Sequence, residues 1–60
     1  MKPIELLQTE VVRLERARES SFEQLGEGKI NFELHEQHMR NLNPLIEEYK
    51  YIIRVINQYA

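Results

Sequence analysis

The sequence predicts an all-α fold, an antiparallel helical hairpin that pairs with a second copy into a homodimeric four-helix arrangement. Apolar residues recur every three or four positions in both halves of the chain, and both glycines lie in a short central segment. One apolar stripe is also wider than a single partner helix can cover. A chain of 60 residues without cysteine has a small core and no disulfide to reinforce it, so we expect one domain, 1–60, that self-associates.

The first predicted helix covers residues 3–25. Pro3 suits a first helical turn, because its missing N–H would have no partner there. Gly26 can adopt the left-handed conformation that ends a helix, and the turn 26–31 then reverses the chain. The apolar residues at helical spacing in this segment are Ile4, Leu7, Val11, Leu14, Phe22 and Leu25.

The second predicted helix covers residues 32–59, with the side chain of Asn31 as its N-terminal cap. Pro44 lies in its interior, where proline removes a hydrogen bond and clashes with the carbonyl of Arg40, at a cost of about 3 kcal/mol. The order of charges favours two helices, whereas the apolar phase continues through the proline and favours one. We therefore expect a bend at 41–44 between nearly coaxial segments, with a separate short helix as the alternative.

The wide apolar stripe lies in this second helix and predicts the face on which two copies meet. An interface between two identical helical hairpins would be isologous, since the same surface contributes from both copies. The predicted self-association residues are Leu42, Leu45, Ile46, Tyr49, Ile52, Ile53, Ile56 and Tyr59.

Three polar residues interrupt the apolar faces and are predicted to form one polar layer. With the turn centred near residue 28.5, residue i faces residue 57 minus i. This places Arg18 by Met39 and its neighbour His38, and Ser21 follows Arg18 on the same stripe. One interpretation is that Arg18 reaches water and His38 stays neutral, in a layer that fixes the helix register. The other is that Arg18 and His38 hold a small anion or a partner's carboxylate.

No motif predicts a catalytic, cofactor-binding or metal-binding site. His35 and His38 are three residues apart, whereas a zinc-protease helix needs histidines four apart with a glutamate directly after the first. Ser20 and Ser21 have no adjacent histidine and no oxyanion-hole signature. We therefore expect a protein that is not an enzyme and has no cofactor.

Charged and exposed residues suggest two further surfaces. Arg13, Arg16 and Lys29 are candidate nucleic-acid contacts, but the chain has a net charge of -2 and its arginines alternate with glutamates, so a solvated charged face is the simpler interpretation. Residues that point away from the helix seam, or that place acids near the end of the first helix, form a candidate surface for another protein. These are Val12, Tyr51, Val55, Glu19 and Glu23.

The expected function is protein binding, by a small adaptor, regulator or inhibitor that acts as a homodimer. A nucleic-acid-associated regulator is the alternative. The lack of cysteine fits a reducing cytoplasm, and the longest apolar run, Tyr51-Ile52-Ile53, is too short for a signal peptide or a membrane span. The size suits an accessory protein of a bacterium or phage.

Overall fold

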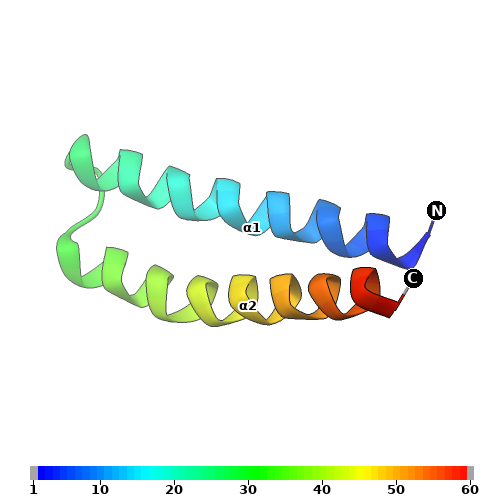
Figure 1. Cartoon of the computed structure of the whole chain (residues 1–60). Helices are drawn as coiled ribbons and strands as arrows, with labels where there is room; N and C mark the ends of the chain where they lie inside the picture. The colour runs from blue at the N-terminus through cyan, green and yellow to red at the C-terminus, as the bar shows by residue number, and fades with distance from the viewer. Residues whose placement is uncertain (1, 60) are drawn as a thin grey trace.

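The chain forms two α-helices that pack side by side in a computed structural model, which describes residues 2–59. Helix α1 runs from Pro3 to Gly26 and helix α2 from Phe32 to Tyr59. The two helices lie antiparallel in a rod of 44 × 19 × 12 Å, with both chain ends at the same end of the rod (Figure 1). The all-helical hairpin predicted from the sequence is thus confirmed, and residues 1 and 60 of the expected domain lie outside the described residues.

The turn between the helices is closed by a C-terminal capping motif. The N–H of Lys29 donates to the carbonyl of Gln24 at 2.9 Å and the N–H of Gly28 to that of Leu25 at 3.2 Å, the bond pattern of a Schellman motif. Gly28 has φ of +76°, whereas Gly26 is the last residue of α1. The prediction that Gly26 adopts the left-handed conformation is wrong, because the motif places that conformation two residues later.

Helix α2 begins as predicted and continues through its proline. The side-chain oxygen of Asn31 accepts a hydrogen bond from the N–H of Leu34 at 2.8 Å, so Asn31 is the N-terminal cap. The helix is unbroken across Pro44, so no separate short helix forms and the expected bend is not confirmed. Pro44 is exposed, so solvent can reach the carbonyl of Arg40, which the proline ring leaves without an amide partner.

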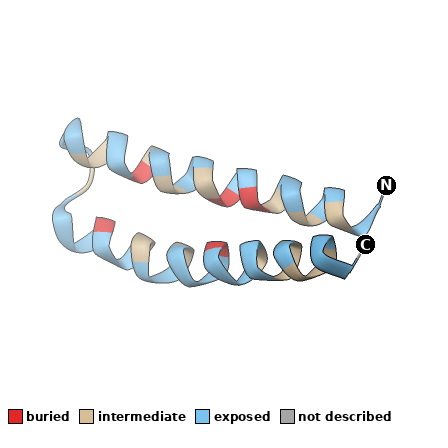
Figure 2. Cartoon of the chain, in the orientation of Figure 1, coloured by how far each residue is buried: buried red, intermediate tan, exposed pale blue. Residues whose placement is uncertain are grey.

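The core between the helices is small. Its buried apolar residues are Val11, Leu14 and Ile46, and only Ile46 is fully inaccessible to solvent. Figure 2 shows the buried positions along the facing sides of the two helices, while the rest of each helix is half-buried or exposed. Ile46 therefore belongs to the core of one chain and is not available to a second copy, although it is among the predicted self-association residues.

The contact between the helices follows a heptad pattern. On α1 the buried and half-buried positions include 4, 7, 11, 14, 18, 21 and 25, and on α2 they include 35, 39, 42, 46, 49, 53 and 56. Both series alternate steps of three and four residues, which is the pattern of knobs-into-holes packing. On α2 this row lies beside the centre of the predicted apolar stripe. The side chains of Leu34, Leu45 and Tyr59 lie outside the row and remain 39%, 42% and 82% exposed. No helix among residues 2–59 is long and apolar enough to cross a membrane.

Candidate functional site

A polar cluster of Ser21, His35 and His38 lies between the helices near the turn. The hydroxyl oxygen of Ser21 is 2.9 Å from Nδ1 of His35 and 2.9 Å from Nδ1 of His38. A serine hydroxyl carries one proton, so it donates to one imidazole and accepts from the Nδ1–H of the other. The two histidines therefore hold opposite tautomers when both are neutral. Ser21 and His35 are only 3% and 5% exposed.

Two aromatic rings cover His35, the buried histidine of this cluster. The ring of Phe22 meets that of His35 edge-on at 4.5 Å between centroids, and the ring of Phe32 lies 6.4 Å from it. Such edge-to-face packing is favourable for aromatic rings. Phe22 and Phe32 are themselves 55% and 63% exposed, so they cover His35 while facing solvent on their other sides.

The polar cluster differs from the predicted layer in one member. His38 and Ser21 meet as the register predicted, but Arg18 lies outside the cluster: its Nη1 donates to Oδ1 of Asn43 at 3.1 Å. Its long side chain leaves the seam and also approaches Glu15 at 3.7 Å. Arg18 and His38 thus have separate partners, and no anion site forms between them. His35 was not predicted here, although it begins the heptad row of α2.

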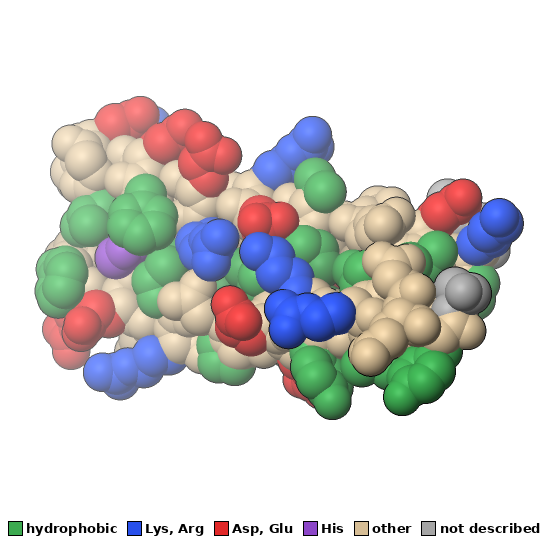
Figure 3. Space-filling model, viewed as in Figure 1, with side chains coloured by type: hydrophobic (Ala, Val, Ile, Leu, Met, Phe, Trp, Pro, Cys, Tyr) green, Lys and Arg blue, Asp and Glu red, His purple; other side chains and the backbone are tan. Residues whose placement is uncertain are grey.

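A charged flank runs along one side of the seam and consists of Glu15, Arg18, Asn43 and Lys50. The carboxylate of Glu15 lies 3.5 Å from Nζ of Lys50 on the other helix. Figure 3 shows a face on which acidic and basic side chains mix across both helices, with hydrophobic side chains grouped around a histidine near the turn. These ion pairs are partly exposed and contribute little to stability, but they make this flank of the hairpin polar.

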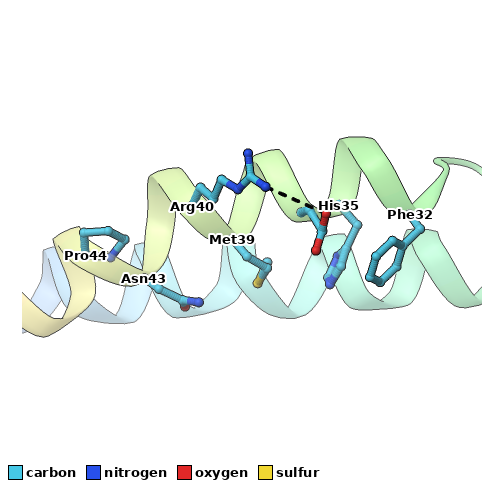
Figure 4. Close-up of a pocket in the computed structure, with 7 residues that line it drawn as sticks. Phe32, His35, Met39, Arg40, Asn43 and Pro44 are labelled. Carbon is cyan, nitrogen blue, oxygen red and sulfur yellow. Dashed lines mark ion pairs between the residues drawn. The ribbon is translucent and has the colours of Figure 1, made fainter.

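An open groove of about 500 Å³ lies along α2 beside the polar cluster. Figure 4 shows Phe32 and His35 at one end and Pro44 at the other, with Arg40 turned toward a carboxylate, that of Glu36, at 4.0 Å. All of its lining residues come from one helix, so it is a surface depression rather than an enclosed site. They are Phe32, His35, Glu36, Met39, Arg40, Asn43 and Pro44.

An apolar flank lies on the other side of the seam and consists of Leu34, Leu45, Ile52, Val55 and Tyr59. Leu45 is two residues from Asn43, which turns it about 200° around the helix, away from the charged flank. Across the seam, the small side chain of Ala17 on α1 borders a hollow of about 310 Å³ between the helices. The hollow is lined by Ala17, His38, Asn41 and Leu42.

The residues of the predicted partner surface are divided between the two helices. Val12 and Tyr51 are 46% and 63% exposed on different helices, and Val55 belongs to the apolar flank. Glu19 and Glu23 are exposed on α1.

The candidate nucleic-acid contacts do not form a free basic surface. Arg13 donates to Glu10, with Nε 3.1 Å from Oε2, and Lys29 pairs with Glu27 at 2.9 Å. Arg16 is exposed and makes no ion pair among the described residues.

The polar cluster offers a serine beside histidines but not an accessible nucleophile. With 3% of Ser21 exposed, its hydroxyl is closed between the helices and cannot reach a substrate. Within residues 2–59 no three His, Asp or Glu side chains come together as a metal site. The chain matches no protein-family model, no curated protein and no solved structure.

Proposed function

We propose that this chain is a non-enzymatic protein-binding module, an adaptor, regulator or inhibitor of the cytoplasm that works as a homodimer. The observation that carries the proposal is the apolar flank. The pairing of α1 with α2 leaves Leu45 42% and Tyr59 82% exposed and half-covers Ile52, while the core of residues 2–59 buries three apolar side chains. Contiguous apolar surface of this kind is typical of protein interaction sites.

The total surface supports the same proposal. A folded monomer of 7.3 kDa is expected to expose about 4,200 Å². The hairpin exposes 4812 Å², which is about 600 Å² more. A standard interface covers about 800 Å² on each partner, so pairing of two hairpins would remove the excess.

A dimer leaves other apolar side chains for a further protein partner. Phe22, Phe32 and Tyr51 are each more than half exposed and do not belong to the apolar flank. Tyrosine and phenylalanine are common anchors of protein interfaces, because they bury a large area with few rotatable bonds. The adaptor role that we propose would use these residues once the apolar flank is covered.

Light scattering over a wide dilution series tests this proposal. We expect a mass near twice 7.3 kDa that falls toward the monomer on dilution, together with helical circular dichroism. Leu45→Glu should shift the mass to that of the monomer at every concentration. Val12→Glu is the matched control, because Val12 is 46% exposed against 42% for Leu45 and lies on the outer face of α1. A monomeric wild-type chain, or equal loss of mass in both variants, would contradict the proposal.

A further inference from the structure

We propose that the second copy lies antiparallel along the apolar flank of α2, with the two-fold axis between Leu45 and Glu48. This inference rests on the proposed homodimer and specifies its interface. It starts from a second heptad row on α2, formed by residues 34, 38, 41, 45, 48, 52, 55 and 59. Their steps alternate between four and three, as do those of the row that faces α1.

The composition of the two flanks of α2 selects this row. It contains the five residues of the apolar flank and three polar ones, His38, Asn41 and Glu48. On the other side of the seam no residue of the corresponding row is apolar. That row consists of Glu33, Glu36, Arg40, Asn43, Glu47, Lys50, Arg54 and Asn57. A helix with apolar heptad rows on two adjacent faces is suited to contact two neighbours, as in a four-helix bundle.

The structure also leaves room for a neighbour on this side. Ala17 is the α1 residue beside the row, and its short side chain leaves the hollow next to Asn41 and Leu42. An incoming side chain can fill a hollow of about 310 Å³, which the hairpin itself leaves open to solvent. On the charged flank, by contrast, Glu15 and Lys50 span the two helices.

The spacing of the row suits a copy that runs in the opposite direction. The series of steps reads the same from either end, so a two-fold axis at its centre brings the whole row against itself. Leu34 then faces Tyr59 of the second copy, and Asn41 faces Ile52. Full overlap covers the largest apolar area, and burial of apolar area is the main favourable contribution to association.

Charge favours the same orientation. In a parallel pair in register, each row residue faces its own copy, so the carboxylate of Glu48 would lie directly opposite that of the second Glu48. Like charges placed opposite each other at a heptad interface oppose pairing. In the antiparallel pair Glu48 faces Leu45, and the two Glu48 residues are displaced by three residues, or about 4.5 Å, along the axis.

Single-cysteine cross-linking tests the orientation directly, because the chain has no cysteine of its own. Leu34→Cys and Tyr59→Cys are each oxidised alone, and a mixture of the two reduced variants is oxidised in parallel. One variant carries a tag that changes its mass. We expect a mixed disulfide dimer as the main product and little product from either variant alone. In the antiparallel pair, each of these residues is displaced from the same residue of the second copy by 25 residues, or about 37 Å along the axis. Leu45→Cys should cross-link to itself, and Val12→Cys is the control that should not.

The masses of the same variants under reducing conditions separate the two proposals. Dimers in which Leu34→Cys and Tyr59→Cys each cross-link to themselves would overturn the antiparallel interface and leave the homodimer standing. Dimers with no cross-link from any residue of the row would place the interface on another face. That result would also overturn the antiparallel interface and leave the homodimer standing. Should Leu45→Cys weaken the dimer, a mixture of Asn41→Cys with Ile52→Cys tests the neighbouring layer of the same interface. Monomers at all concentrations would overturn the homodimer itself.

Discussion

Ser21→Ala is expected to lower the free energy of unfolding by about 2 kcal/mol. The hydroxyl is the hydrogen-bond partner of both imidazoles, and its loss leaves Nδ1 of His35 without a partner in a residue that is 5% exposed. An unsatisfied buried polar group costs about 1–3 kcal/mol. His38 is half-buried, so water can replace the lost bond there, and the higher helix propensity of alanine offsets up to about 0.5 kcal/mol.

Ser20→Ala provides a matched control in the adjacent residue. The side chain of Ser20 is part-buried and only accepts a hydrogen bond from Gln24 at 3.1 Å, so its loss should change stability by less than about 0.5 kcal/mol. Urea unfolding followed by circular dichroism, at one fixed protein concentration, compares the two variants. Adding His35→Leu to Ser21→Ala should recover most of the loss, because both polar groups are then removed. Equal stability of the two serine variants would refute the role assigned to the cluster.

Four other substitutions test local features of the fold. Gly28→Ala should lower the free energy of unfolding by about 1–2 kcal/mol, because Gly28 has φ of +76°. Gly26→Ala should raise the free energy of unfolding by about 0.5–1 kcal/mol, because Gly26 lies within the helix and has open space around it. Denaturant unfolding of both variants checks that the two changes have opposite signs. Pro44→Ala should raise the free energy of unfolding by about 1–3 kcal/mol by restoring a helical hydrogen bond, as measured by the thermal midpoint. The hydrogen bond from Arg13 lowers the pKa of Glu10. The ion pair therefore stabilises the fold when the pH is above the ordinary pKa of glutamate, and this stabilisation is lost as the pH falls through the lowered pKa of Glu10. NMR titration should show a higher pKa of Glu10 in Arg13→Ala.

Local signals in the sequence were sufficient for the helix ends. Pro3 begins α1, and the side chain of Asn31 caps α2, as their residue types predict. The turn was harder, because Gly26 and Gly28 both permit positive φ. Only the backbone hydrogen bonds from Gly28 and Lys29 to α1 distinguish them, and these depend on the path of the chain.

The sequence did not separate the face of α2 that meets α1 from the face beside it. Two heptad rows lie side by side on this helix, and both contain apolar residues. Ile46 belongs to the row that faces α1, and Leu45 belongs to the outer row. Periodicity alone locates their combined centre, so it does not show which row faces α1. Burial resolves this, with Ile46 fully buried and Leu45 at 42% exposure.

The same ambiguity explains the polar cluster. His38 belongs to the outer row and was predicted in the polar layer. His35 belongs to the inner row and was considered only as a metal ligand, which its spacing from His38 argued against. The signal that could have identified it is its position four residues before Met39, at the start of the row that continues to Ile56. The partner of Arg18 was less accessible to sequence reasoning, because a long side chain can leave the seam in several directions.

The thermal unfolding midpoint, measured at several protein concentrations, tests the proposed homodimer most directly. A chain that completes its core with a second copy unfolds from dimer to two monomers, so a tenfold rise in concentration stabilises the folded state by about 1.4 kcal/mol per dimer. We predict a midpoint that rises steadily with concentration in the wild-type chain and in Val12→Glu, and a midpoint that stays constant in Leu45→Glu. Superimposable unfolding curves at all concentrations would contradict the homodimer.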